Sequence, residues 1–355
     1  MSTTTLHQRA EEYAGHQHPG YALGARTLQV VGLTQLTDEI LHIELADPAG
    51  TPLAPYQPGS HLIIAAGEGR RNAYSLTGDG FNPCTYEISV LRLDTGEGGS
   101  AWLHDNLEIG RSVTIEGPRS MFPAVHDQQH AVLVAGGIGV TPVLSHARAL
   151  ARSGKSATIL YSYRPGHEAH LDDLRALAGE RIRLVEATSV DETRTALEVL
   201  LADQPFGTHG YACGPAPMLE AYEAAALEAG WPAGRVHLER FVAPELDPGD
   251  PFTATIASTG QKVEIPSGVS LLDGLLNAGI PVNYLCKQGV CGECRIAVKT
   301  AKALEHRDFV LTAEEKQAAA HIMACVSRGH DIEVDLWPRP SSNRPSQEER
   351  HDHHT

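Results

Sequence analysis

Cysteine is scarce in this chain, with 6 residues among 355. Long hydrophobic runs are also missing, since no apolar stretch has the length of a bilayer-spanning helix or of the hydrophobic part of a secretory signal. The 28 Lys and Arg are outnumbered by 44 Asp and Glu, which gives a formal net charge of −16. This charge repels the phosphate backbone of nucleic acids. We therefore expect a soluble cytoplasmic protein that binds neither nucleic acid nor membrane.

The length of the chain and its apolar patterns predict a multidomain protein. Residues 25–127 contain short alternating apolar runs between Pro, Gly and Asp clusters, which predict an antiparallel β-barrel. Residues 128–242 alternate strand-like and helix-like segments, which predict an α/β domain with a parallel sheet. Residues 243–250, rich in proline and acid, are interpreted as a linker. A smaller α+β domain is predicted at residues 251–338.

The two ends of the chain show weak periodicity. Residues 1–24 have few large apolar side chains, and residues 339–355 are similarly polar. We predict a flexible arm and a flexible tail.

Three cysteines crowd into the short stretch CKQGVCGEC. Cys286, Cys291 and Cys294 have the spacing C-x4-C-x2-C, and Cys325 follows further along the chain. This is the plant-type ligand pattern for a [2Fe–2S] cluster. Zinc is the competing metal, but its usual frame pairs two C-x2-C knuckles. Four thiols that were merely buried in a core would need no such spacing. The two glycines of the stretch let the backbone curl round a cluster and direct amide N–H groups at sulfur.

The last domain resembles the plant-type ferredoxin family, which has a β-grasp fold. The resemblance covers residues 251–338 and includes DFVLTAEEK and IMACVSRG, which flank the fourth cysteine. It implies that Cys286 and Cys291 bind the more exposed iron. Cys294 and Cys325 would bind the other iron.

Two stretches of the barrel, RNAYSL and GEGGSAWL, resemble the flavin signature of the ferredoxin-reductase superfamily. In that superfamily, Tyr and Ser of the first stretch face the isoalloxazine, while a Gly-Gly-Ser turn at a helix start binds the flavin phosphate. The family arginine two places before the tyrosine is Asn72 here, with Arg71 displaced by one. Taken alone, each stretch could be an ordinary strand or turn. The resemblance implies flavin contacts by Arg71, Asn72, Tyr74, Ser75, Leu76, Gly98, Gly99 and Ser100.

The sequence GGIGVTP follows the first strand of the parallel-sheet region. Its glycines permit close approach of the backbone to a diphosphate, and its threonine begins a helix whose dipole faces that group. The Cys-Gly-Pro of YACGPAPM resembles the superfamily element beside the nicotinamide, although Cys213 could instead be a small core residue. Arg164 could bind a 2′-phosphate or cap its strand. The predicted nucleotide residues are Gly136, Gly137, Gly139, Thr141, Cys213, Gly214 and Pro215.

The order of barrel, nucleotide domain and C-terminal ferredoxin resembles the reductase components of Rieske non-haem iron oxygenases, of the phthalate dioxygenase reductase type. This resemblance implies FMN as the flavin and NADH as the donor. It implies that Phe241 covers the flavin, and that Ser75 and Cys213 orient the reacting rings. Electrons would pass from FMN singly to the [2Fe–2S] cluster.

The chain lacks the Cys-His pairs of a Rieske centre, because no cysteine is followed two residues later by histidine. We therefore expect a separate terminal oxygenase of the Rieske type as the acceptor, docking near Lys287 to Val290. Two alternatives remain open. The acceptor could be another enzyme such as a cytochrome P450, or the chain could be a redox-sensing carrier module with little turnover.

Overall fold

The computed structural model describes residues 24–67, 70–94, 98–241 and 246–336. The tail predicted at 339–355 lies outside these residues, and so does the arm predicted at 1–24 except for its last residue. The chain divides into two compact units, Met1–Pro244 and Glu245–Thr355, and each is described by itself.

The first part of unit 1 is a six-stranded antiparallel sheet in the order β4-β3-β6-β1-β2-β5. An isolated bridge between Leu76 and Ile88 joins the end of β4 to β5 and closes the sheet into a barrel. Alternating apolar side chains such as Leu28, Ile43 and Leu62 fill its core. The elements are β1 (Arg26–Thr37), β2 (Ile40–Ala46), β3 (Ser60–Ala66), β4 (Arg70–Ser75), β5 (Thr85–Leu91), α2 (Gly99–Asn106) and β6 (Ser112–Ser120).

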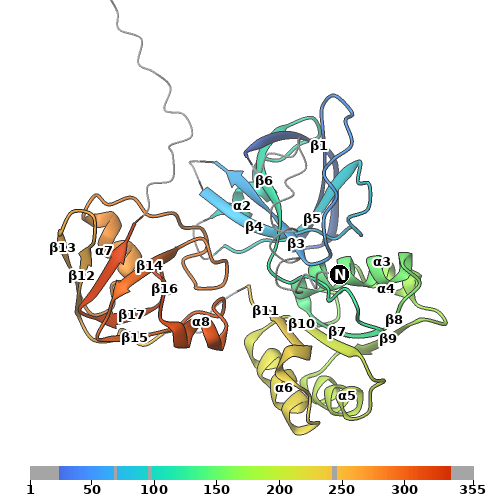
Figure 1. Ribbon diagram of the computed structural model, residues 1–355. Coiled ribbons are helices and arrows are strands. Elements are labelled where there is room, and N and C mark those ends of the chain that lie inside the picture. Colours follow the sequence, from blue (N-terminus) through green and yellow to red (C-terminus); the bar gives the residue numbers. More distant parts are fainter. Residues whose placement is uncertain (1–23, 68–69, 95–97, 242–245, 337–355) are drawn as a thin grey trace, which may run out of the picture. The chain divides into compact units, whose positions relative to one another are not determined.

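The second part of unit 1 is a five-stranded parallel sheet in the order β11-β10-β7-β8-β9. Helices α3 and α4 pack on one face, and α5 and α6 on the other, as Figure 1 shows. Because β8 and β9 lie on one side of β7 and β10 and β11 on the other, the strand order reverses between β7 and β10. The elements are β7 (His130–Gly136), η1 (Gly137–Gly139), α3 (Val140–Arg152), β8 (Ser156–Ser162), α4 (Leu171–Leu177), β9 (Ile182–Ala187), α5 (Val190–Ala202), β10 (Thr208–Cys213), α6 (Ala216–Glu228), η2 (Ala233–Arg235) and β11 (Val236–Glu239).

Helix α3 joins the parallel sheet to the barrel. Ser145 Oγ donates a hydrogen bond to the carbonyl of Gly78 (2.6 Å), and Arg148 donates to the carbonyl of Thr77 (3.1 Å) and to Glu87 Oε2 (3.0 Å). Thr77 and Gly78 follow β4 almost directly in the chain. The helix that begins at the glycine loop therefore fixes the strand that carries the predicted flavin residues.

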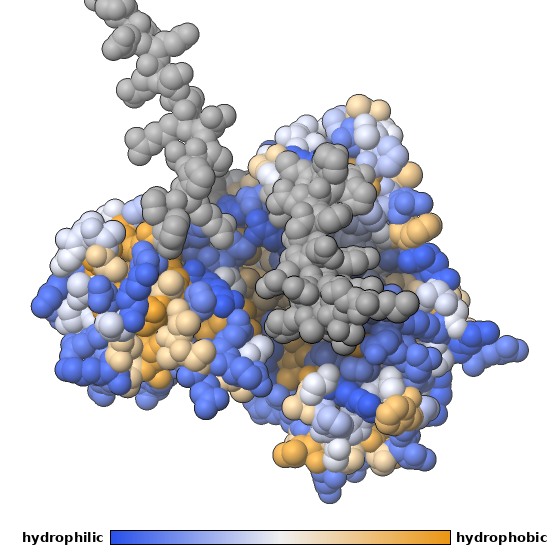
Figure 2. Space-filling view, in the orientation of Figure 1, coloured by the Kyte–Doolittle hydropathy of each residue, from blue (hydrophilic) through white to orange (hydrophobic). Residues whose placement is uncertain are grey.

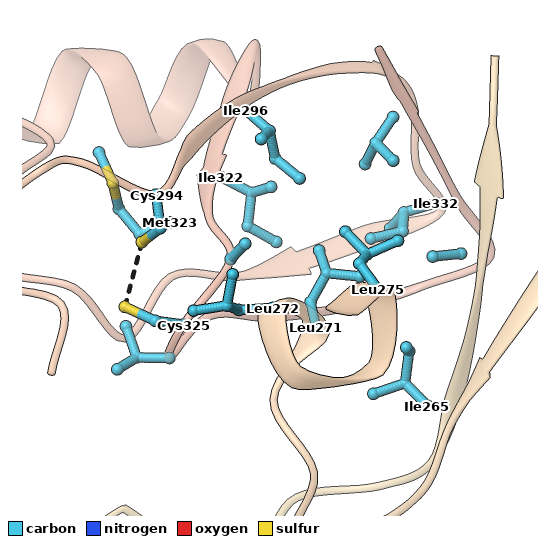
Figure 3. Close-up of a cluster of buried hydrophobic side chains, with 14 of the residues drawn as sticks. Ile265, Leu271, Leu272, Leu275, Cys294, Ile296, Ile322, Met323, Cys325 and Ile332 are labelled. Atoms are coloured by element: carbon cyan, nitrogen blue, oxygen red, sulfur yellow. Dashed lines mark hydrogen bonds between the residues drawn. The ribbon is translucent and has the colours of Figure 1, made fainter. Parts of the chain in front are cut away.

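Unit 2 is a mixed sheet in the order β13-β12-β18-β14-β16, with β15 and β17 forming a separate ladder. Its core packs α7 against the sheet, and Figure 3 shows Leu271, Leu272 and Leu275 of α7 facing Ile322 and Ile332. The elements are β12 (Phe252–Ile256), β13 (Lys262–Ile265), α7 (Leu271–Asn277), β14 (Arg295–Thr300), β15 (Ala303–Glu305), α8 (Ala313–Ala318), β16 (His321–Met323), β17 (Arg328–His330) and β18 (Ile332–Asp335).

The predicted fold class is confirmed in all its parts, with an antiparallel barrel, a parallel-sheet nucleotide domain and a ferredoxin-like domain. The short strands β15 and β17 are additions that the sequence pattern did not predict. Over α5 and α6, Figure 2 shows hydrophobic patches among hydrophilic residues. Within the described ranges, no helix combines the length and the apolar character needed to cross a membrane.

Candidate functional site

The four predicted cluster cysteines meet in unit 2. Cys294 Sγ lies 3.1 Å from Cys325 Sγ, and Figure 3 shows the two sulfur atoms facing each other at one end of the core. The thiols of Cys291 and Cys325 hydrogen-bond that of Cys286 and lower its pKa. In the described ranges, no group of three or more His, Cys, Asp or Glu side chains is arranged to hold a single metal ion. The donor set, four cysteine sulfurs in contact with one another, fits a two-iron cluster.

The backbone of the cysteine loop is shaped to present amide groups to sulfur. Lys287, Gly289 and Gly292 have φ values of 55, 71 and 77°, so the chain turns repeatedly. The amides of Gln288 and Val290 donate hydrogen bonds to the Cys286 thiol, the first over 3.3 Å. Donors aimed at sulfur favour additional negative charge on a thiolate-bound centre.

The Gly-Gly-Ser turn of the barrel lies against β4. A Cβ at Gly99 would be 2.2 Å from Asn72 Oδ1, so the side chain of Asn72 reaches the start of α2. A Cβ at Gly98 would be 3.8 Å from the guanidinium carbon of Arg70. The side chains of Arg70, Asn72 and Tyr74 share one face of β4 because strand residues alternate. A cation therefore does lie beside the predicted phosphate turn.

The cation beside this turn is Arg70 and not Arg71, which the sequence resemblance named among the flavin contacts. Arg71 is exposed and donates to Glu116 Oε1 of the neighbouring sheet (2.6 Å). Arg70 could have been found from the period of two in the strand, because it stands four places before Tyr74 and faces the same side. The family motif places its arginine two positions before the tyrosine, which is Asn72 in this chain.

The three predicted ring contacts differ in their surroundings. The Tyr74 hydroxyl is buried and has no hydrogen-bond partner, and burial raises its pKa. An orphaned polar atom of this kind fits a ligand that supplies a partner. Ser75 is buried at the end of β4, paired across the ladder with His61. The side chain of Leu76 lies in the barrel core and its amide donates to the carbonyl of Ser60 (2.8 Å).

Ser100 ends this turn inside α2. Its hydroxyl accepts a hydrogen bond from the amide of Leu93 (3.1 Å), which connects the helix start to the end of β5. Of the flavin residues named from the sequence, Asn72 of β4 lies against Gly99 of α2, whereas Arg71 pairs with Glu116 and the side chain of Leu76 lies in the barrel core.

The glycine loop after β7 and the Cys-Gly-Pro element after β10 interlock. A Cβ at Gly139 would be 2.2 Å from the carbonyl oxygen of Cys213, and a Cβ at Gly214 would be 3.0 Å from Gly136 Cα. Gly137 has a φ of 51° and open space on its side-chain side. These loops sit at the carboxyl ends of β7 and β10, where the strand order reverses. Ligands of open parallel sheets bind at such a switch point.

Two other predicted nucleotide residues also lie in this region. Thr141 is buried in the first turn of α3, and its hydroxyl donates to the carbonyl of Ile138 (3.0 Å). Pro215 caps the start of α6. Phe241 is 38% exposed just beyond β11.

Cys213 has an acidic neighbour that the sequence analysis did not single out. Glu239 lies directly across from it in the parallel ladder between β10 and β11. Its Oε2 is buried without a partner, and burial raises the pKa of this carboxyl to about 8. Burial and the nearby Glu239 also raise the pKa of the Cys213 thiol. The motif ERF held the signal, because its Glu stands at the carboxyl end of a strand beside the switch point.

A buried Ser-His-Asp group lies where α4 meets the barrel. Ser89 Oγ is hydrogen-bonded to His170 Nε2 (2.7 Å) and to His42 Nδ1 (2.9 Å). Asp173 Oδ2 accepts from His170 Nδ1 (2.7 Å), which lowers the pKa of Asp173 to about 2. Because Ser89 is buried and shared between two imidazoles, we interpret the group as a structural contact and not as a hydrolase site.

The chain matches two known domain families. Residues 119–236 match the N-terminal domain of the DmmA-like subunit of dimethylamine monooxygenase. Residues 254–329 match the 2Fe-2S iron-sulfur cluster binding domain.

Relatives that match most of the chain are reductase or oxygenase subunits. The heme-dependent oxidative N-demethylase beta subunit of Ectopseudomonas mendocina is 38% identical, over 85% of this chain and 95% of its own. Phthalate dioxygenase reductase of Burkholderia cepacia is 34% identical, over 88% and 97%.

A solved phthalate dioxygenase reductase, described as a modular structure for electron transfer from pyridine nucleotides to [2Fe-2S], is similar with a TM-score of 0.66 and 32% identity over 88% of this chain and 98% of that one. An intact type IV self-sufficient cytochrome P450 monooxygenase is similar with a TM-score of 0.75 and 31% identity, over 94% of this chain and 44% of that one. The chain therefore belongs to the family of oxygenase reductase subunits that includes phthalate dioxygenase reductase.

Proposed function

We propose that this chain takes electrons from NADH and passes them through FMN and a [2Fe–2S] cluster to a separate terminal oxygenase. The observation that carries the proposal is the meeting of four cysteine thiols in unit 2 of a chain whose unit 1 has the reductase fold. When bound, FMN accepts two electrons as a hydride and releases them one at a time, while the cluster carries one electron. Everything else in the mechanism concerns binding and orientation by this chain.

At the flavin site, the first turn of α2 supplies amide N–H groups to the phosphate. Gly98, with a φ of 79°, allows this turn, and the nearby Arg70 and Asn72 supply a positive charge and an amide. Tyr74 and Ser75 would contact the flavin, and the unpaired hydroxyl of Tyr74 would be available to it as a hydrogen-bond partner. Their positions support the flavin assignment.

At the nucleotide site, the loop at Gly136 to Gly139 would hold the diphosphate, and the backbone beside Cys213 would hold the nicotinamide. Cys213 contributes a compact, uncharged side chain, because its raised pKa keeps the thiol protonated. Glu239 supplies a buried carboxyl next to it. Phe241, which is partly exposed just beyond β11, would cover a bound flavin. The joining of α3 to the end of β4 supports a fixed geometry between the two sites.

In unit 2, Cys286, Cys291, Cys294 and Cys325 hold the cluster, and the loop at Lys287 to Val290 is the docking edge for the acceptor. The proposed domain boundaries remain 25–127, 128–242 and 251–338, with a linker at 243–250. We place the protein in the cytoplasm, where NADH is supplied.

The identity of the acceptor is proposed as a Rieske-type oxygenase, following the phthalate dioxygenase reductase relative. A haem enzyme is the second candidate. The relative at 38% identity bears the name of a heme-dependent oxidative N-demethylase, and the P450 structure is similar over 94% of this chain. Reduction of purified Rieske and haem oxygenases in the presence of NADH would separate these candidates.

The proposal is tested by anaerobic titration of the purified protein with NADH, with the released flavin identified by chromatography. We expect flavin and iron–sulfur absorption to bleach together and FMN to be released. Replacing Cys291→Ser should preserve NADH oxidation by ferricyanide, which accepts electrons from flavin, and abolish cytochrome c reduction. Equal loss of both activities would contradict the relay, and iron without flavin would reduce the chain to a carrier module.

A further inference from the structure

Unit 2 contains a buried histidine with no hydrogen-bond partner. His306 follows β15, and its side chain is 9% exposed. Both ring nitrogens are buried and unpaired, which is true of no other residue in the described part of the chain. A buried polar group without a partner is costly, and such a group calls for a specific explanation.

The nearest charged group to this imidazole is a buried carboxylate. His306 Nδ1 lies 3.8 Å from Oδ2 of Asp308, whose side chain is 0% exposed. Asp308 Oδ1 accepts from the amides of Val310 (3.1 Å) and Leu311 (2.8 Å), and its Oδ2 accepts from the hydroxyl of Ser327 (3.4 Å). The carboxylate is therefore held in place, with its Oδ2 turned toward the imidazole.

This segment contacts both cysteine-bearing stretches. The ladder of β15 and β17 pairs Glu305 with Arg328, so His306 follows on opposite Ser327, two residues beyond Cys325. On the other side, the amide of Phe309 donates to the carbonyl of Gly289 (3.0 Å), between Cys286 and Cys291. The segment that carries His306 thus spans the loop and the fourth cysteine.

The other charged groups around the segment are already engaged. Lys316 of α8 donates to the carbonyl of Asp308 (2.6 Å), and Arg328 of β17 donates to the carbonyls of Asp250, Pro266 and Val269. Arg307 pairs with Glu305 and Asp247. None of these cations pairs with the Asp308 carboxylate. A proton on His306 would supply a positive charge beside that carboxylate, in the segment that contacts both cysteine-bearing stretches.

We propose that His306 binds a proton when the cluster gains an electron, so that reduction adds one electron and one proton to this buried region. The electron comes from the flavin and the proton from water, and both leave when the acceptor oxidises the cluster. The physical reason is that an added negative charge in a low-dielectric interior strengthens the binding of a nearby proton. The inference rests on the proposed function, because it needs a cluster at the four cysteines.

The test is the midpoint potential of the cluster between about pH 5.5 and 9. It is measured on the full-length protein by mediated titration with dithionite, and the reduced cluster is followed by electron paramagnetic resonance. The wild-type potential should fall as pH rises, by up to about 59 mV per pH unit, the one-electron equivalent of a tenfold change in proton concentration. In His306→Gln the potential should be independent of pH. The matched control, His330→Gln, changes an exposed histidine of β17 and should retain the wild-type slope.

A second variant covers the case in which His306→Gln loses its cluster. Asp308→Asn removes the negative charge but keeps an oxygen that accepts from the amides of Val310 and Leu311. In this variant, the pH range over which the midpoint potential changes should move to lower pH. A wild-type potential that does not change with pH would overturn the inference, and so would a slope that survives in His306→Gln. Because dithionite replaces NADH, a pH-dependent potential in a protein that NADH cannot reduce would support His306 and reject the proposed function. A protein without a cluster would reject both.

Discussion

The cluster site and the nucleotide crevice are built from different parts of the polypeptide. The cluster site is lined by four cysteine side chains whose sulfur atoms lie in contact with one another. The crevice is formed by the backbone of two loops, where Gly139 approaches the carbonyl of Cys213 and Gly214 approaches Gly136. Side-chain ligands leave a fixed spacing in the sequence. A site formed by backbone is marked in the sequence only by glycines. Glycines are also needed wherever two segments pack closely, so a glycine pattern says less about function than a cysteine spacing does.

Glu239 is the side chain that most disturbs this comparison, because it introduces a buried ionisable group into the backbone-made crevice. Its folded pKa is about 8 against an ordinary 4.5, so the neutral carboxyl stabilises the fold. That contribution is complete below about pH 4.5 and is lost as the pH rises through 8. Glu239→Gln cannot ionise. At pH 9 it should be more stable than wild type by roughly 2–5 kcal/mol in urea unfolding, with little difference at pH 5.

The control for this variant is Glu228→Gln, which changes an exposed residue at the end of α6. Its stability should follow that of wild type at both pH values. If Glu239→Gln also showed no gain at pH 9, the carboxyl would be hydrated or paired in solution, and the crevice would hold no buried acid.

The two neighbouring arginines of β4 test the flavin site. Arg70→Ala should weaken FMN binding by about 10- to 100-fold, because a charge-assisted contact with phosphate contributes roughly 1.5–3 kcal/mol. Arg71→Ala removes an exposed ion pair with Glu116 and should change FMN binding by less than about threefold. Quenching of FMN fluorescence during titration of the flavin-free protein measures both. If Arg71→Ala weakened FMN binding more than Arg70→Ala did, Arg71 and not Arg70 would be the phosphate contact.

These arginines show where sequence reasoning succeeded and where it could not. The fold class followed from periodicity, since apolar alternation indicated the barrel and alternating strand and helix patterns indicated the parallel sheet. The cysteines followed from spacing. The positions of Arg70 and Glu239 beside the candidate sites were not predicted, because they depend on which residues share a strand face or stand across a ladder. Such neighbours come from pairing between strands that are distant in the chain.

The unpaired state of His306 was invisible in the sequence for a similar reason. His306 itself was included in no prediction, and its significance comes from the register of β15 and β17 and from the burial of Asp308. No local pattern reports that an imidazole lacks a partner. Only the folded chain shows which polar atoms remain unsatisfied.

The smallest expected effect concerns the contact between the two loops. Gly139→Ala places a Cβ 2.2 Å from the carbonyl oxygen of Cys213 and 2.8 Å from the amide of Gly214, so the loops must separate. Overpacking of this kind costs roughly 1–3 kcal/mol. We expect a lower free energy of unfolding for unit 1 and a higher KM for NADH, with FMN binding unchanged, because the flavin turn lies on other elements.

The matched control is Gly234→Ala in η2, which has open space at its Cβ position and should behave as wild type. Comparing KM for NADH with FMN affinity separates a local effect from general unfolding, which would weaken the binding of both NADH and FMN. If Gly139→Ala left KM and stability unchanged, the loops would have room between them. The crevice would then owe its shape to side chains, as the cluster site does, and the distinction between the two regions would disappear.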